Sequence, residues 1–372
     1  MAELYVGIVS GTSLDGLDTA LVELGADTCN VVRARTTPFP EPLGDGLAAL
    51  VADPRTDLRD LGALNVAFAE FVAECVLALL VDSGHEPDEI TAIGFSGHTI
   101  FHQPLPPGAF TLQLGDPSTI AARTHITTVA DLRSMDVAFG GQGAPVLPAL
   151  HAWQLGDAEE IRVAVNIGGI ANLTCLNPSR AVTGFDSGPG NALMDAWIRL
   201  AGRGPFDHDG TWAKSGTVVS DLLRRLRSDD YFSLPAPKST GLEHFNLAWV
   251  QRALADVPEP APADVQATLL ELTATTIADA IKASEPEAQR VIVCGGGAYN
   301  AALVRRLEAL VAPAVVETSA AHGIEPAWVE AAGFAWLARA RLKCAAGNMP
   351  SVTGAREPAV LGGVYSGETP NA

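Results

Sequence analysis

One carboxylate in a glycine-rich turn is the clearest candidate for catalysis. Asp186 lies in the run Phe185–Asn191 (FDSGPGN), where a predicted strand ends and a tight turn leads into a helix. Catalytic groups of α/β proteins are often placed at such strand ends. Capping the helix is the structural alternative for Asp186, but Ser187 or Asn191 meets that need without a charge. We therefore predict that Asp186 is catalytic.

Three glycine-rich turns, each after a predicted strand, indicate a bound nucleotide. Small residues let backbone N–H groups and hydroxyls converge on a phosphate, and a following helix N-terminus adds to the attraction. Each turn alone also suits a polar hairpin or close helix–strand packing; together they favour a nucleotide. The P-loop and Rossmann glycine patterns are absent after the first strand. The predicted nucleotide-binding residues are Gly11, Thr12, Ser13, Leu14, Asp15, Gly16, Leu17, Asp18, Gly168, Gly169, Gly295, Gly296 and Gly297.

The sequence identifies no metal ligands. His98 and His102 are spaced four residues apart, but they flank a proline-rich loop, and zinc-protease histidine motifs are missing. The protein ligands of any metal are therefore left unknown.

These candidate residues need strands to position them, and the strand pattern occurs twice. Each copy has three consecutive strands with a glycine-rich first turn, followed by helices and further strands. The pattern indicates an internal duplication of one α/β unit with a mixed sheet. The strands of the first copy are predicted at residues 4–10, 17–23, 30–37, 90–96, 110–114 and 127–130; those of the second lie at 161–167, 171–176, 181–185, 290–294 and 314–317.

The duplication divides the chain into two domains. We predict an N-terminal α/β domain at residues 1–132 and a C-terminal α/β domain at 133–372. The second domain carries a loop-rich insertion near 204–244, and its last helix (325–344) is able to pack back on the first domain. Ligands of paired domains commonly bind in a cleft between them. The sequence thus predicts mixed sheets around a central cleft.

Composition excludes several kinds of partner. The 372-residue chain has a net charge of −19, which disfavours binding to nucleic acid or anionic lipid. Five scattered cysteines favour reduced thiols in the cytoplasm. The N-terminus lacks a signal-peptide pattern. Residues 61–81 approach membrane length, but Glu70 and Glu74 and the helical spacing of the apolar residues indicate a half-buried helix.

A set of motifs, in order from residue 6 to residue 355, closely resembles the anhydro-N-acetylmuramic acid kinase family. The resemblance implies the fold of the acetate and sugar kinase, Hsp70 and actin superfamily. Residues 1–132 would then form an actin-like ATPase domain and residues 133–372 an actin-like domain. It also implies a reaction in which 1,6-anhydro-N-acetylmuramic acid, ATP and water give N-acetylmuramic acid 6-phosphate and ADP. Peptidoglycan recycling, a cytoplasmic location, Mg²⁺ and a homodimer are further implications. The motifs are GIVSGTSLDGLD, ADLRSMDVAFGGQGAPVLP, NIGGIANLT, FDSGPGNALMDAW, DGTWAKSG, PKSTGLEHFN, CGGGAYNAALVRRL, EPAWVEAAGFAWLA and GNMPSVTGA.

The resemblance also assigns roles to individual residues. It makes Asp186 the catalytic base and the Gly11–Asp18 turn a holder of the ATP phosphates, with the Gly295–Gly297 turn near the nucleotide. The implied substrate-binding residues are Thr99, Arg133, Gly141 in the 140–143 loop, and Glu330. An exposed position on the last helix is the alternative interpretation of Glu330.

Departures from the family pattern leave alternatives open. Ser96 and His98 replace a usual His and Gln, Leu242 replaces a usual Arg, and Ala327 replaces a common Asp. We expect Ser96 and His98 to affect the choice of sugar. One alternative is therefore a kinase of the same fold that acts on another anhydrosugar such as levoglucosan. A simple hydroxyl-phosphorylating sugar kinase and a non-catalytic nucleotide-gated binding protein are the others.

Overall fold

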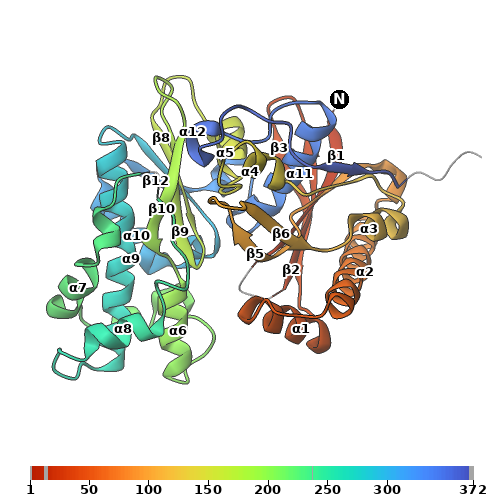
Figure 1. Cartoon of the computed structure of the whole chain (residues 1–372). Coiled ribbons are helices and arrows are strands. Elements are labelled where there is room, and N and C mark those ends of the chain that lie inside the picture. Colours follow the sequence, from red (N-terminus) through yellow and green to blue (C-terminus); the bar gives the residue numbers. More distant parts are fainter. Residues whose placement is uncertain (1, 12–15, 237, 368–372) are drawn as a thin grey trace, which may run out of the picture. The chain divides into compact units, whose positions relative to one another are not determined.

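The computed structural model describes residues 2–11, 16–236 and 238–367. The chain forms two compact units, Met1–Gln154 with Trp328–Ala372, and Leu155–Ala327. Each unit contains a mixed β-sheet and flanking helices (Figure 1).

The sheet of the first unit has the strand order β13-β7-β4-β1-β2-β3. Strands β1, β2 and β3 form an antiparallel meander, and β4 adds to β1 in parallel. Strand β7 continues the parallel part, and β5 and β6 form a separate antiparallel ribbon. The strands are β1 (Glu3–Ser10), β2 (Leu17–Leu24), β3 (Cys29–Thr37), β4 (Ile90–Phe95), β5 (His98–Gln103), β6 (Phe110–Leu114), β7 (Thr128–Ala130) and β13 (Gly363–Tyr365).

The sheet of the second unit has the order β10-β9-β8-β11-β12. Here β8, β9 and β10 form the antiparallel meander, and β11 and β12 continue in parallel from β8. The strands are β8 (Arg162–Ile167), β9 (Ile170–Leu176), β10 (Thr183–Pro189), β11 (Arg290–Cys294) and β12 (Val315–Thr318).

The two sheets repeat one topology. Strands β8, β9, β10, β11 and β12 occupy the places of β1, β2, β3, β4 and β7, with the same parallel and antiparallel pairings. The predicted duplication is therefore confirmed. The fold is the predicted actin/hexokinase-like one, with two α/β units and mixed sheets.

Helices cover the sheets in both units. In the first unit they are α1 (Glu41–Ala52), α2 (Leu58–Ser83), α3 (Pro117–Thr124), α4 (Ser134–Ala138), α11 (Val329–Leu342) and α12 (Pro350–Thr353), and α5 (Pro148–Leu155) ends at the unit boundary. In the second unit they are α6 (Ala192–Leu200), α7 (Ser220–Arg227), α8 (Leu247–Leu254), α9 (Pro262–Ser284) and α10 (Ala301–Val311).

Helix α2 has the length and apolar composition of a membrane span, yet half of its most apolar window is buried inside the protein. Phe68, Val72 and Leu79 lie on its buried face and belong to the core of the first unit. On another face, Glu70 forms an ion pair with Arg123 of α3 at 2.7 Å. The contacts agree with the half-buried helix that the sequence predicts.

Helix α11 packs on the first sheet although it comes late in the sequence (Figure 1). Gly7 of β1 and Gly94 of β4 are paired neighbours in the sheet. A Cβ atom at Gly7 would overlap the carbonyl oxygen of Ala331, and one at Gly94 would overlap that of Phe334. Glycine at both positions is therefore what lets the helix backbone lie directly on the sheet.

The compact units divide the chain differently from the predicted boundary at residue 132. Residues 133–154 and the segment from Trp328 onward both belong to the first unit. Hydrogen bonds join these two segments, because the Gln142 N–H donates to the Thr353 carbonyl and the Arg356 N–H donates to that of Phe139. Such pairing between segments more than 200 residues apart has no local sequence signal.

Candidate active site

Asp186 lies inside strand β10, not at its end as the sequence suggested. Strand β10 continues to Pro189, and its register against β9 shifts between Asp186 and Gly188. A β-bulge of this kind bends the strand and changes the direction of a side chain. The predicted end at residue 185 is wrong because glycine, proline and serine inside a bulged strand have the composition of a turn.

The segment after α7 holds Asp186 by three hydrogen bonds. The Thr240 N–H donates to Oδ2 of the carboxylate at 3.0 Å. The Asp186 N–H donates to the Lys238 carbonyl at 3.1 Å, and the Tyr231 hydroxyl donates to the Asp186 carbonyl at 2.7 Å. Within the described part of the chain, the Thr240 N–H is the one donor to the carboxylate. Oxygen Oδ1 can therefore accept a proton from water.

The electrostatic environment suits a general base. Burial raises the pKa of the Asp186 carboxyl from 3.8 to about 6; the Thr240 N–H opposes this shift, and the charge of Glu243 adds to it. A base works best when its pKa lies near the working pH, because it is then both ionised and able to take a proton. Asp186 has that property.

The predicted glycine turns of the second unit meet at one edge of its sheet. Strands β8 and β11 run parallel, so the turns that follow them, at Gly168-Gly169 and Gly295–Gly297, lie at the same edge. A Cβ atom at Gly295 would overlap the Asn166 side chain, and one at Gly297 would overlap Ile167. These glycines thus allow two strand ends to approach closely.

Strand β10 joins this edge to the carboxylate. After Asp186 the strand leads to Gly190, whose N–H donates to the Gly169 carbonyl at 2.9 Å. The Asn191 N–H donates to the Gly168 carbonyl at 2.8 Å. The second unit therefore places the candidate base and two predicted phosphate-binding turns on connected backbone.

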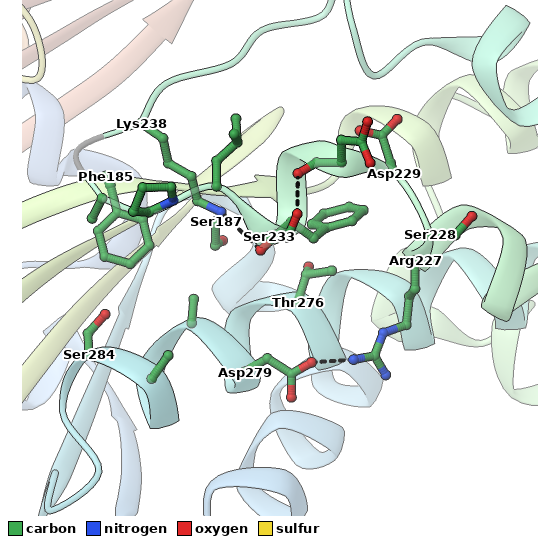
Figure 2. Close-up of a pocket in the computed structure, with 17 residues that line it drawn as sticks. Phe185, Ser187, Arg227, Ser228, Asp229, Ser233, Lys238, Thr276, Asp279 and Ser284 are labelled. Atoms are coloured by element: carbon green, nitrogen blue, oxygen red, sulfur yellow. Dashed lines mark hydrogen bonds and ion pairs between the residues drawn. The ribbon is translucent and has the colours of Figure 1, made fainter.

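A pocket of about 660 Å³ lies behind β10 (Figure 2). Phe185 and Ser187, the neighbours of Asp186 in the strand, line it, and Asp186 does not. Successive side chains of a strand point to opposite faces, so this pocket is on the side away from the carboxylate. Helix α9 and residues 227–230, 232–236 and 238 form its other walls, with an Arg227–Asp279 ion pair at one side.

The first unit places several polar residues next to the predicted phosphate turn. Thr12, Ser13, Leu14 and Asp15 lie outside the described residues. Ser10 and Leu17 flank this turn and are paired in the β1–β2 hairpin. Gly11 and Gly16 are described next to these two strand ends, and the Asp18 carboxylate accepts a hydrogen bond from Thr36 at 2.6 Å.

Ser96 and His98 contact Ser10, directly before this turn. The Ser10 hydroxyl and His98 Nδ1 are 2.8 Å apart, and the Ser10 N–H donates to the Ser96 hydroxyl at 3.3 Å. Burial lowers the pKa of His98 to about 4, so the imidazole is neutral at neutral pH. These two departures from the family pattern are thus connected to the predicted nucleotide side.

Thr99 belongs to a polar face of the β5–β6 ribbon that the sequence did not identify. Gln113 donates from Nε2 to the Thr99 and Thr111 hydroxyls at 3.2 Å and 2.6 Å. His102 Nδ1 lies 2.9 Å from the same Thr111 hydroxyl. Alternation along the two strands could have indicated this face, but the sequence interpretation left residues 98–103 outside any strand.

Arg133 and Glu330 are brought together in the first unit. Burial lowers the pKa of Arg133, and the Glu330 charge opposes that shift. The guanidinium donates from Nη1 to the Gly143 carbonyl at 2.9 Å, while its Nε has no hydrogen-bond partner among the described residues. The charge of Arg133 also lowers the pKa of His102, after the larger effect of burial. Thus α11 brings the predicted Glu330 to the predicted Arg133.

Gly141 occupies a loop fixed by a buried carboxylate. Asp136 accepts hydrogen bonds from the Gly143 N–H at 2.7 Å, from Asn348 at 2.7 Å and from Thr353 at 2.8 Å. A Cβ atom at Gly141 would overlap the Asp136 side chain. The structure therefore gives this glycine a packing reason in addition to its predicted contact with the sugar.

Across residues 2–11, 16–236 and 238–367, no group of three or more His, Cys, Asp or Glu side chains is arranged to hold a metal ion. A Mg²⁺ ion that accompanies ATP usually keeps several waters and binds mainly to phosphates.

Comparisons with known proteins identify the family. Residues 3–367 match the family model for anhydro-N-acetylmuramic acid kinase. The anhydro-N-acetylmuramic acid kinase of Saccharophagus degradans is 46% identical over 368 residues, which are 98% of this chain and 99% of the relative. That of Xanthomonas axonopodis pv. citri is 48% identical over 366 residues, with 97% and 98% covered.

A solved structure shares the fold. The reductive activator for a corrinoid, iron-sulfur protein matches with a TM-score of 0.50 at 15% identity, over 94% of this chain and 63% of that one. At this identity the likeness concerns the fold alone. The family match and the two full-length relatives lead to one conclusion: this chain belongs to the anhydro-N-acetylmuramic acid kinase family.

Proposed function

We propose that the chain uses ATP to open and phosphorylate 1,6-anhydro-N-acetylmuramic acid, with Asp186 as the general base. The observation that carries this assignment of the base is the Asp186 carboxylate on bulged strand β10. Its pKa is raised to about 6, and its Oδ2 is held by the Thr240 N–H. The family supplies the overall reaction, and this carboxylate supplies the means to activate water.

The reaction balances with one base and one phosphoryl acceptor. Asp186 takes a proton from water, and the water oxygen forms a bond to the anomeric carbon of the sugar. The bond between that carbon and O6 breaks, and O6 takes the γ-phosphoryl group of ATP while ADP leaves. This chemistry joins the base step of an inverting glycosidase to a kinase reaction. Because phosphorus accepts the electrons of O6, a separate acid for the leaving oxygen is unnecessary.

The nucleotide is assigned to the glycine turns and the sugar to the polar residues of the first unit. Backbone N–H groups at Gly11–Asp18, Gly168-Gly169 and Gly295–Gly297 are suited to phosphate. Mg²⁺, carried with ATP, would reduce the negative charge of the phosphates. Arg133, Glu330 and the Thr99 face of the ribbon are proposed to contact the sugar; among the described residues the buried Arg133 Nε has no hydrogen-bond partner.

The cellular setting is also a proposal. We place the enzyme in the cytoplasm, in peptidoglycan recycling, and as a homodimer. In the described part of the chain its five cysteines form no disulfide; four of them are buried and Cys344 is exposed, which suits a reducing compartment. The chemistry of the proposed substrate, an anhydrosugar released from cell wall, supports the recycling role.

Replacement of the base tests the mechanism. Asp186→Asn should lower kcat by about 10²–10⁴-fold and leave ATP binding intact. In ¹⁸O-labelled water, the wild-type product should carry the label at its anomeric hydroxyl and not in its phosphate. A rate near that of wild type in the Asn variant would show that another group acts as the base, with Glu330 the first to examine. Asp256→Asn, which alters an exposed surface carboxylate, is the matched control.

One feature favours testing a second anhydrosugar. Leu242, which stands where the family usually has Arg, lies beside Gly169. Its Cδ2 atom would be 3.7 Å from a Cβ atom at residue 169. A substrate panel should therefore compare anhydro-N-acetylmuramic acid with levoglucosan and with unbridged N-acetylmuramic acid. Preference for levoglucosan would reassign the substrate, and equal turnover of the unbridged sugar would make the enzyme a simple hydroxyl kinase.

A further inference from the structure

The segment formed by residues 231–236 and 238–240 is bound to Asp186 through the main chain and the side chain. Among the described residues, strand β10 is an edge strand that pairs with β9 alone in its sheet. On its free side, the Lys238 carbonyl accepts from the Asp186 N–H, and the Tyr231 hydroxyl donates to the Asp186 carbonyl. The Thr240 N–H then binds the carboxylate. All three hydrogen-bonding groups of this residue are therefore held by one segment.

We infer that Tyr231 is a positioning residue, which sets the orientation of the Asp186 carboxylate through the Asp186 main chain. This inference rests on the proposed role of Asp186 as the base. Tyr231 is itself firmly placed: it is 5% exposed, and its ring makes an edge contact with that of Phe245 at 5.5 Å. A fixed hydroxyl at 2.7 Å from a backbone carbonyl limits the rotation of that peptide group.

A second set of bonds fixes Tyr231 and closes the segment. Asp229 accepts from the Tyr231 N–H at 3.0 Å, from Trp249 Nε1 at 2.8 Å, and from His244 Nε2 at 3.0 Å. At the other end, the Lys238 ammonium donates to the Tyr231 carbonyl at 3.0 Å and lies 4.6 Å above the Tyr231 ring. Tyr231, which begins the segment, is thus also held by Lys238 near the other end.

The bulge in β10 is shaped to accept this segment. Gly188 has φ +144°, a conformation that residues with a side chain rarely adopt, and a Cβ there would lie 2.7 Å from the Phe232 ring. Phe232 can therefore lie against the strand only because residue 188 is glycine. The same bulge also directs the Asp186 side chain. The place where the segment packs on β10 and the orientation of the carboxylate are therefore determined together.

The pocket behind β10 makes these hydrogen bonds more important. Residues 232–236 and Lys238 line it, so this part of the segment faces open volume instead of a packed core (Figure 2). Where packing is incomplete, hydrogen bonds must supply more of the positional restraint. Loss of the Tyr231 hydroxyl should therefore loosen Asp186 more than it would in a fully packed site.

The test is the variant Tyr231→Phe, which removes the hydroxyl and keeps the ring. We expect kcat to fall about fivefold to tenfold, the effect of one neutral hydrogen bond, with the KM values for ATP and sugar within twofold. The acid limb of the kcat profile should move to lower pH. A loosened carboxylate gains water, and the burial that raises its pKa is reduced.

Two further variants separate positioning from general destabilisation. Tyr5→Phe removes the hydroxyl of another buried tyrosine, which donates to Glu3 at 3.2 Å; it should leave the acid limb unmoved. In an Asp186→Asn background, Tyr231→Phe should have less than a twofold additional effect on kcat, because its partner in catalysis is already absent.

The outcomes distinguish the inference from the proposed function. An unchanged kcat and acid limb in Tyr231→Phe, with Asp186→Asn inactive, would overturn the inference and leave Asp186 as the base. Full multiplicative loss in the double variant would also overturn it, since Tyr231 would then act independently of Asp186. A near-normal rate in Asp186→Asn alone would instead overturn the proposed function.

Discussion

The raised pKa of Asp186 predicts that the candidate base destabilises the protein that carries it. The Asp186 carboxyl has its pKa raised from 3.8 to about 6, mainly by burial. Because the folded state holds this proton more tightly than the unfolded chain, its contribution to stability is fully present below pH 3.8. That contribution is lost as the pH rises through about 6. A shift of about two units corresponds to about 3 kcal/mol in the free energy of unfolding.

The variant Asp186→Asn should remove this destabilisation, because an amide carries no charge at any pH and can still accept from the Thr240 N–H. At pH 8 we expect the variant to be more stable than wild type by about 2–3 kcal/mol. For a domain of 150–250 residues this is roughly a 4–12 °C rise in Tm. At pH 4 the two proteins should have nearly equal stability, because Asp186 is then protonated in the folded wild type.

The assay is calorimetric unfolding of both proteins at pH 4 and pH 8, with Asp256→Asn as the control. Asp256 is an exposed carboxylate paired with Arg225, and such pairs contribute little to stability. A variant that is no more stable than wild type at pH 8 would refute the argument from burial. An equal gain at both pH values would also refute it, because the gain would then not arise from the charge. A gain in stability together with lost activity would show that the base is kept for function.

Three other predictions concern glycine packing and the nucleotide side. Gly297→Ala should lower the Tm and raise the KM for ATP, since the new Cβ would overlap Ile167. Overpacking usually lowers the free energy of unfolding by about 1–3 kcal/mol. Thermal unfolding and an ATP titration check the two effects. Gly62→Ala, in the second turn of α2 with open space at its Cβ, should instead stabilise the protein by about 0.5–1 kcal/mol, and an unchanged or lower Tm would contradict this. His98→Leu removes the hydrogen-bond partner of Ser10 and should raise the KM for ATP by roughly threefold to tenfold. Steady-state kinetics with both substrates tests this. A change in the KM for the sugar instead would contradict the prediction and show that His98 affects the choice of sugar.

Local patterns were enough to predict the duplicated architecture and most of its elements. Alternation and helical spacing identify strands and helices from side chains that are neighbours in sequence. Strand β6 is found at Phe110–Leu114, at its predicted bounds. The sequence also predicted the glycine turns at Gly168-Gly169 and Gly295–Gly297; the pairing of β8 with β11 brings these turns to one edge, because parallel strands end at the same side of a sheet.

Other features depend on contacts that local patterns do not encode. The position of α11 follows from Gly7 and Gly94, which lie more than 230 residues before Ala331. The continuation of β10 through Asp186 follows from its pairing with β9 and from the segment at 231–240, which the sequence presented as a loop-rich insertion.

The sequence by itself determined the family, the duplicated units and the candidate base, because these depend on residue identity and short-range order. The tertiary structure alone decided what gives Asp186 its pKa and its orientation. Desolvation depends on which atoms surround a carboxylate, and the Thr240 and Tyr231 hydrogen bonds join residues 45–54 positions away. A pKa is a property of an environment, and the folded chain creates that environment from distant segments.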